Sequence, residues 1–221
     1  MELSLIGGHD LRLKHPFTLL LAGPTGTGKT QLIIRLLNNY QHTTTIRKER
    51  IKLLFCYGIW QESYKLITNP NIDITFHEGF CFDYDEMRPD VLVLDDLMNE
   101  IANDKKLTAA FTKTSHHLNI SVIFITQNVF HQSKQMRTIS LNSHYIILMK
   151  APRDKMQIMT LGRQIYPINS KFFMQAYEEA VKEPYGHLII DMTSTTDDNL
   201  RLRQRKTMNG KEGYEIYMPK N

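Results

Sequence analysis

Residues 23–30 of this chain are Gly-Pro-Thr-Gly-Thr-Gly-Lys-Thr, which matches the pattern G-x-x-x-x-G-K-T. The apolar run 17–22 precedes them, and a segment with apolar residues at helical spacing follows, namely Leu32, Ile33, Leu36 and Leu37. A buried strand, a glycine-rich turn and a helix in this order form the phosphate loop of nucleotide-binding proteins. Average residue usage produces the four fixed positions by chance in about one chain of this length in a hundred.

Each part of the loop has a physical role in holding a nucleoside triphosphate such as ATP. The glycines let the backbone curl until its N–H groups converge on the α- and β-phosphates, and Lys29 adds a charge near the β- and γ-phosphates. Thr30 offers a hydroxyl to Mg²⁺, and the positive end of the following helix faces the phosphates. The expected binding residues are Gly23, Pro24, Thr25, Gly26, Thr27, Gly28, Lys29 and Thr30.

The composition suits one globular domain. The chain has 221 residues, of which 42% are hydrophobic and 23% charged, so it can bury a full core. Its net charge of +4 permits a nucleic-acid partner without indicating one. Because no long apolar segment and no signal-peptide pattern occurs, we expect an intracellular protein that does not cross a membrane. Cys56 and Cys81 lack metal-binding spacing, and we expect reduced thiols.

The order of apolar runs and helical patterns predicts the fold class. Buried strands are expected at residues 51–57, 91–94, 120–125, 144–149 and 186–191, and helices at 97–114, 153–164 and 171–182. This alternation predicts a three-layer α/β sandwich with a mainly parallel central sheet. Residues 131–142 are expected to form a polar, basic connection. We expect residues 1–192 to be the ATPase domain and 193–221 a basic strand and tail, packed on it or extending from it.

Two acidic residues, Asp95 and Asp96, end the predicted strand 91–94. Lys29 precedes Asp95 by 95 − 29 = 66 residues, which leaves room for a further strand, as in the additional-strand division of phosphate-loop ATPases that includes RecA and FtsK. There the first acid holds Mg²⁺ through its waters and the second polarises the attacking water. Glu is usual at the second position, and Asp96 is shorter by one methylene. Either the water lies closer to the strand, or Asp96 serves the metal and another group, with Glu100 nearest, is the base. The alternative without chemistry is that the pair caps the next helix.

Gln127 and Asn128 follow the next predicted strand. The carboxyl ends of parallel strands form the edge at which open α/β sheets bind ligands. Either side chain is therefore expected to sense the γ-phosphate or to orient the attacking water.

Positive charge gathers in two connections. In a strand, Arg201, Arg203 and Arg205 would share one face. That face would either contact DNA phosphates or protect an exposed sheet edge from aggregation. Lys134, in the basic connection, is a second candidate for contacts to DNA phosphates.

Five segments together resemble a known family. They are residues 23–30, Val-Leu-Val-Leu-Asp-Asp-Leu-Met at 91–98, Ile-Ser-Val-Ile-Phe-Ile-Thr-Gln-Asn at 120–128, Leu-Asn-Ser-His-Tyr at 141–145 and Ala-Pro-Arg-Asp-Lys at 151–155. They resemble the FtsK/HerA-type genome-packaging ATPases of double-stranded DNA viruses, in particular the poxvirus-like enzymes of polinton and adintovirus elements. The resemblance spans residues 17–191.

This resemblance implies a hexameric or pentameric ring that uses ATP and Mg²⁺ to feed double-stranded DNA through the portal vertex into a preformed capsid, at the host-cell site of virion assembly. Two positions depart from the wider FtsK pattern: Asp96 replaces Glu, and His116 stands where cellular members carry an arginine. The arginine finger is therefore unassigned. We expect Arg137 to act on a neighbouring subunit and Arg153 on its own, although either could be a surface charge or a DNA contact.

Two other classes of protein share the loop. A small-molecule kinase would need an arginine-rich lid, and the region after Gln127 has too few arginines in one cluster. A nucleotide-dependent assembly or scaffold protein would share every motif. ATP hydrolysis measured with and without duplex DNA distinguishes the three classes.

Overall fold

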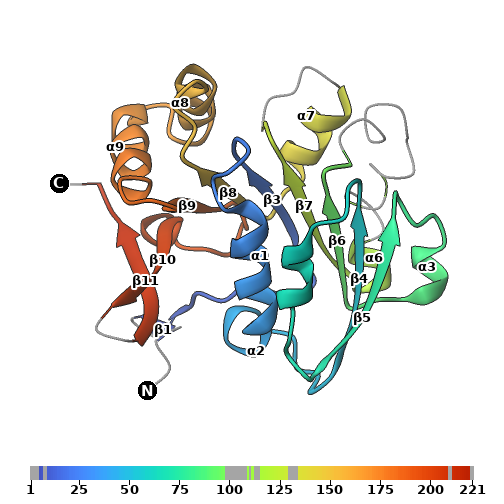
Figure 1. The fold of residues 1–221 in the computed structure, drawn as a ribbon. Helices are drawn as coiled ribbons and strands as arrows, with labels where there is room; N and C mark the ends of the chain where they lie inside the picture. The colour runs from blue at the N-terminus through green and yellow to red at the C-terminus, as the bar shows by residue number, and fades with distance from the viewer. Residues whose placement is uncertain are drawn as a thin grey trace.

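The computed structural model describes residues 5–6, 9–97, 109, 111, 115–128, 134–208 and 211–219. Its centre is a nine-stranded sheet with the strand order β11-β10-β9-β8-β3-β7-β6-β4-β5 (Figure 1). The strands of this sheet are β3 (Thr18–Ala22), β4 (Ile51–Tyr57), β5 (Ile72–Glu78), β6 (Val91–Asp95), β7 (Ser121–Thr126), β8 (Tyr145–Met149), β9 (His187–Asp191), β10 (Leu202–Met208) and β11 (Lys211–Tyr217). A separate antiparallel pair consists of β1 (Leu5–Ile6) and β2 (His9–Asp10).

The central part of the sheet is parallel, from β8 through β3, β7, β6 and β4 to β5. Strand β7 lies between β3, which leads into the phosphate loop, and β6, which ends in the acidic pair. The 66-residue spacing contains β4 and β5, so the further strand predicted there is present, whereas β7 follows Asp95 in the chain. Among the described strands of this sheet, the antiparallel pairs are β8 with β9, β9 with β10 and β10 with β11.

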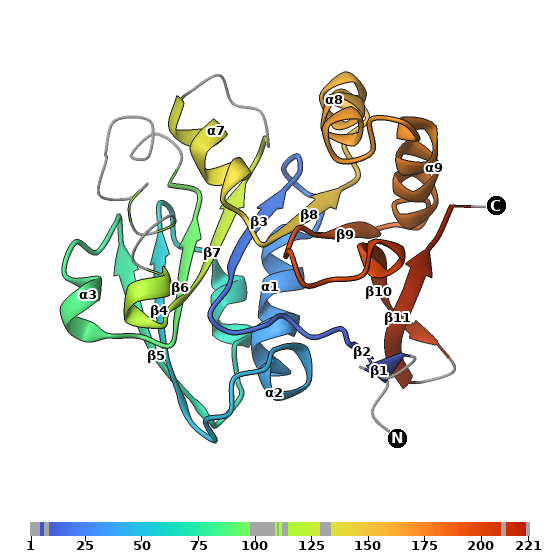
Figure 2. The same ribbon diagram turned by 180° about the vertical axis from the view of Figure 1, so that it is seen from behind.

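Helices cover both faces of the sheet and form the three predicted layers (Figures 1 and 2). Alternate residues of β3 face opposite layers, with Leu19 and Leu21 in one core cluster and Leu20 in the other. The first layer contains α1 (Lys29–Asn38), α2 (Tyr40–Thr43) and the 3₁₀ helix η1 (Glu62–Leu66). The second layer contains α3 (Tyr84–Met87), α6 (Ser115–Leu118), α7 (Lys134–Leu141), α8 (Lys155–Ile165) and α9 (Ser170–Ala180). A further 3₁₀ turn, η3 (Asp198–Leu200), precedes β10.

The structure differs from the predicted elements in one connection. Residues 131–142 were expected to be a polar connection, yet helix α7 occupies most of that segment because Met136 and Ile139, three residues apart, are buried in the core. Helices α8 and α9 match the predictions within two residues at each end. The predicted helix 97–114 falls mainly outside the described residues. No helix in the described ranges is long and apolar enough to cross a bilayer.

The arginines of the C-terminal hairpin are paired inside the fold. Strand β10 is not an edge, because it pairs with both β9 and β11. Arg203 is 1% exposed and donates to Asp191 Oδ2 at 3.0 Å, Arg201 donates to the Asp191 carbonyl oxygen at 2.7 Å, and Arg205 pairs with Glu212. Protection of an exposed sheet edge is therefore wrong, and burial excludes Arg203 from contacts to DNA phosphates. Such contacts by Arg201 and Arg205, which are partly exposed, stay a prediction. The domain boundary at residue 192 stays a prediction.

Removing the Arg203 side chain should destabilise the protein strongly. In Arg203→Ala the Asp191 carboxylate would stay buried without its cation, so we expect the free energy of unfolding to fall by about 3 to 5 kcal/mol. Urea unfolding measures this loss. The matched control, Arg47→Ala at an exposed position, should change stability by less than about 0.5 kcal/mol. Equal, small effects of the two substitutions would contradict a stabilising role for the buried pair.

Candidate nucleotide-binding site

The phosphate loop joins β3 to α1 at the carboxyl edge of the parallel strands. Gly26 and Gly28 have φ values of +81° and +89°, in the left-handed region that favours glycine. A Cβ atom at Gly23 would lie 2.5 Å from the Cβ of Met149 on β8, so glycine lets the loop lie against the neighbouring strand. Glycine is therefore required at residues 26 and 28 for backbone conformation and at residue 23 for close approach to β8.

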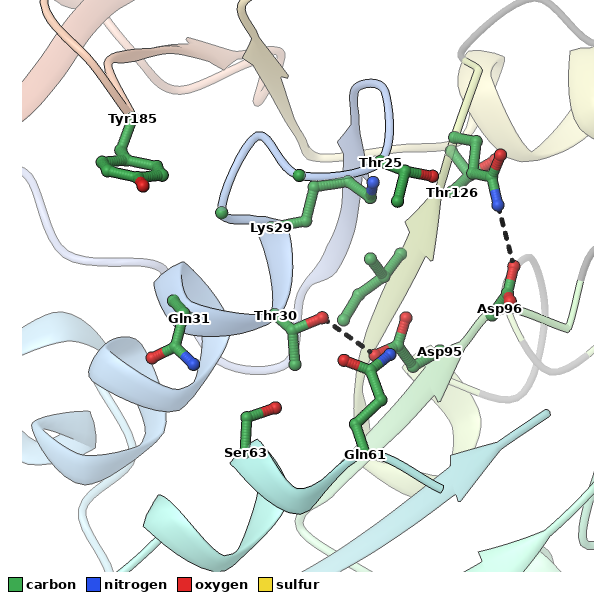
Figure 3. Close-up of a pocket in the computed structure, with 14 residues that line it drawn as sticks. Thr25, Lys29, Thr30, Gln31, Gln61, Ser63, Asp95, Asp96, Thr126 and Tyr185 are labelled. Carbon is green, nitrogen blue, oxygen red and sulfur yellow. Dashed lines mark hydrogen bonds between the residues drawn. The ribbon is translucent and has the colours of Figure 1, made fainter. Parts of the chain in front are cut away.

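Lys29, the first residue of α1, holds its ammonium group inside the curl of the loop (Figure 3). Its Nζ atom donates to the carbonyl oxygens of Gly23 and Pro24 at 2.7 and 3.0 Å. Burial lowers the pKa of Lys29, while the carboxylates of Asp95 and Asp96 oppose that shift. The cation predicted to face the β- and γ-phosphates is thus held at the loop by its carbonyl groups.

Asp95 ends β6 and is buried, and Figure 3 shows the Thr30 hydroxyl directed at its carboxylate. Its Oδ2 atom accepts hydrogen bonds from Tyr64 Oη at 3.0 Å and Thr30 Oγ1 at 3.3 Å. Burial raises the pKa of Asp95, and the bonds from Tyr64 and Thr30 oppose that rise. A hydroxyl and a carboxylate so close together suit Mg²⁺, which prefers oxygen ligands and would compensate the buried negative charge. Thr30 and Asp95 therefore fit the metal site predicted for them.

Tyr64 is a site residue that the sequence analysis missed. It lies in η1 and is fully buried, and its ring packs against Phe55 at a centroid distance of 4.6 Å and against Trp60 at 5.4 Å. Trp60 therefore belongs to the same aromatic cluster as Tyr64. In the sequence, Trp60 and Tyr64 are four residues apart, which is the spacing of one helical face. This spacing does not indicate that the Tyr64 hydroxyl reaches Asp95 at the end of β6.

Asp96 is separated from its neighbour by a change in backbone direction. Its φ value is +58°, and its side chain is exposed, whereas Asp95 is buried. The turn requires a close approach to Gly58, where a Cβ atom would lie 2.7 Å from the Asp96 carbonyl oxygen. Gln127 Nε2 donates to Asp96 Oδ1 at 3.4 Å. The two carboxylates thus have different surroundings, since one accepts hydrogen bonds from the hydroxyls of Tyr64 and Thr30 and the other lies beside Gln127.

One cavity of about 380 Å³ brings these groups together. Among the residues predicted to form the site, its lining contains Thr25, Gly26, Gly28, Lys29, Thr30, Asp95, Asp96 and Gln127. Gln61, Ser63 and Tyr185 also line it, although no motif singled them out. Asn128 instead lines a separate cavity of about 20 Å³ next to Gly23.

Neither candidate arginine finger lines the nucleotide cavity of this chain. Arg137 is an exposed residue of α7, and Arg153 is exposed in the connection between β8 and α8. Lys29 is the one lysine or arginine in the cavity lining among the described residues. Glu100, the alternative base, lies outside the described ranges.

The strand order and the loop define the fold of the phosphate-loop NTPases, in the additional-strand class. No protein-family model matches this chain, and no curated protein sequence matches it. Solved structures do match it in fold.

The DNA-packaging ATPase B204 of Sulfolobus turreted icosahedral virus has a TM-score of 0.54 and 15% identity, covering 94% of this chain and 99% of its own. The genome-packaging NTPase B204 of Sulfolobus turreted icosahedral virus 2, in complex with AMPPCP, has a TM-score of 0.55 and 14% identity, covering 92% of this chain and 97% of its own. At such identities the likeness establishes the shared fold.

Removing the Tyr64 hydroxyl should weaken the metal site without unfolding it. Tyr64→Phe keeps the packed ring but leaves Asp95 with one hydroxyl donor fewer, so we expect the Mg²⁺ concentration for half-maximal nucleotide binding to rise about 10-fold. Tyr40→Phe is a matched control, because it removes a buried hydroxyl that donates to backbone carbonyls away from the cavity. The same Mg²⁺ dependence in both variants would refute the role of Tyr64.

Proposed function

We propose that this protein is an ATP-hydrolysing motor that drives double-stranded DNA into a viral capsid. The observation that carries this proposal is the meeting of Lys29, Thr30, Asp95 and Asp96 around one cavity. The surrounding fold is shared, over nearly the whole length of both chains, with structures described as viral genome-packaging NTPases. Neither half of this observation would be sufficient alone, because many proteins with unrelated substrates share the loop.

The residues of the cavity divide the proposed chemistry among them. Lys29 exchanges its carbonyl partners for oxygens of the β- and γ-phosphates. Thr30 and Asp95 would hold Mg²⁺, which when bound would neutralise phosphate charge. Asp96 accepts a proton from the water that attacks the γ-phosphorus, while Gln127 orients that water. The bond from the γ-phosphorus to the bridging oxygen then breaks, which releases ADP and phosphate.

The larger assembly is part of the same proposal. We infer an FtsK/HerA-type ring of six or five subunits that takes DNA through the portal vertex at the host-cell site of virion assembly. The motif resemblance over residues 17–191 supports this reading. Burial removes Arg203 from this role, so Lys134, at the start of α7, and the partly exposed Arg201 and Arg205 remain the candidates for contacts to DNA phosphates.

A ring also explains how the site gains a second positive charge beside Lys29, which the described lining of the cavity does not contain. The transition state of phosphoryl transfer spreads negative charge that Lys29 and Mg²⁺ neutralise only in part. Arg137 is exposed on α7, which follows β7 and Gln127, and we propose that it completes the site of the next subunit, with Arg153 acting within its own.

ATP hydrolysis with and without duplex DNA tests the proposed function. Duplex DNA should stimulate the wild-type rate and lose that effect as salt rises, because phosphate contacts release counterions. Lys29→Ala should lose nucleotide binding, whereas Asp96→Asn should bind Mg-ATP and turn over about 10² to 10⁴ times more slowly. A wild-type rate in Lys29→Ala would refute the loop assignment. A hydrolysis rate that duplex DNA does not change at any salt concentration would favour the alternative of a scaffold protein.

Mixing inactive subunits tests the role of Arg137. Lys29→Ala subunits combined with Arg137→Ala subunits should recover part of the ATPase activity, because some interfaces then join an intact loop to an intact arginine. Arg47→Ala, at an exposed position outside the cavity, provides the control and should stay active by itself. Confirmed ring assembly without recovery at any mixing ratio would exclude Arg137 as the group acting across the interface.

A further inference from the structure

Tyr185 lies over the phosphate loop, and both its exposed ring and its backbone conformation are unfavourable in free energy. Its side chain is 71% exposed, and its φ value is +61°, in the left-handed region. It occupies the third position of the turn 183–186, which Gly186 N closes by donating to Glu183 O at 3.1 Å. With Pro184 at the second position, glycine or asparagine would be the usual residue there. Exposed aromatic area and left-handed backbone both cost free energy, and such costs gather at ligand sites.

The Tyr185 ring contacts the loop at a position where only glycine leaves room. A Cβ atom at Gly28 would lie 2.9 Å from the Cδ1 atom of Tyr185. Figure 3 shows the ring on the opposite side of Lys29 and Thr30 from Asp95 and Asp96. The aromatic ring and the acidic pair therefore lie at the two ends of the site.

A second cavity, of about 400 Å³, begins at Tyr185 and shares Gly28, Gln31 and Tyr185 with the first. Its wall includes the apolar side chains of Leu32 and Leu66, unlike the charged wall of the first cavity. Both volumes lie in the range of small-molecule sites.

A buried histidine also belongs to the wall of the second cavity. The Nε2 atom of His187 has no hydrogen-bond partner within the described part of the chain. Burial lowers the pKa of His187 to about 4, so its ring is neutral at pH 7. Arg35 is the one lysine or arginine that this wall contains among the described residues. Apart from Arg35, the wall is uncharged and combines apolar side chains with the amides of Gln31, Asn38 and Asn39. Such a wall suits an uncharged aromatic base, which can also form hydrogen bonds with amides, better than a phosphate.

We propose that Tyr185 is the stacking surface for the base of the bound nucleotide and that the second cavity holds its nucleoside end. This assignment rests on the proposed function, since it requires a nucleoside triphosphate in the loop. A triphosphate whose γ-phosphate lies beside Asp95 and Asp96 extends across the start of α1, past Gln31, toward Tyr185. The base then meets an aromatic ring that a tight turn has already oriented, which limits the entropy lost on binding.

Binding measured separately for ATP and for inorganic tripolyphosphate tests this proposal. Isothermal titration with Mg²⁺ should show that Tyr185→Ala weakens ATP binding about 5- to 150-fold, the range of about 1 to 3 kcal/mol for loss of one stacked base. Tripolyphosphate, which lacks a base, should bind that variant as it binds the wild type. Tyr185→Phe should retain ATP affinity within about 3-fold, because the stacking ring remains. Phe82→Ala, which removes an aromatic ring that is 50% exposed outside both cavities, should change neither affinity.

The outcomes separate this proposal from the proposed function. Unchanged ATP affinity in Tyr185→Ala would overturn it, and so would equal weakening of ATP and tripolyphosphate, which would indicate a damaged loop. If the wild type binds ATP with the expected Tyr185 dependence but does not hydrolyse it, the base site stands and the motor function fails. If the wild type binds ATP no more tightly than tripolyphosphate, the base site fails whatever the hydrolysis rate.

Discussion

The parallel register of β3, β7 and β6 is the constraint on which the rest of this structure depends. Ala22 pairs with Thr126, and Asp95 pairs with Ile125, so the three strands end at one level. These strands are buried on both faces, and a shift of one residue would move every side chain to the opposite layer. Hydrophobic packing thus places the phosphate loop, the acidic pair and Gln127 at one edge, although none of them contributes to that packing.

The buried carboxylates of Asp191 and Asp95 have different hydrogen-bond donors, and this difference separates a structural role from a binding role. Asp191 accepts a hydrogen bond from the guanidinium of Arg203, so its charge is balanced within the fold. Asp95 accepts hydrogen bonds from the hydroxyls of Tyr64 and Thr30, and burial raises its pKa. Hydroxyl groups orient a carboxylate without supplying a positive charge. The first carboxylate therefore belongs to the structure, while the second is suited to attract a cation from solution.

The phosphate loop and the acidic strand end could be predicted because their chemistry is local. Glycines at positive φ, a lysine and a threonine at the start of a helix, and acids after an apolar strand are recognisable within a few residues. The 66-residue spacing between Lys29 and Asp95 also predicted room for a further strand, and β4 and β5 lie there. Sequence periodicity did not predict burial that depends on residues far apart in the chain. The arginines of β10 follow strand periodicity, but the sequence does not reveal that Arg203 pairs with Asp191 or that β11 pairs with β10.

The sequence alone was enough for the fold class, the phosphate loop and the positions of Asp95 and Gln127 at the ends of neighbouring strands, since short-range pattern and strand order determine all of these. Only the folded chain revealed Tyr64 behind Asp95 and Tyr185 over Gly28. Each of these tyrosines contacts a residue in another element of the chain, and a sequence pattern does not give the distance between two such elements. The physical reason is that local preferences decide which elements form, whereas packing between elements decides which side chains meet.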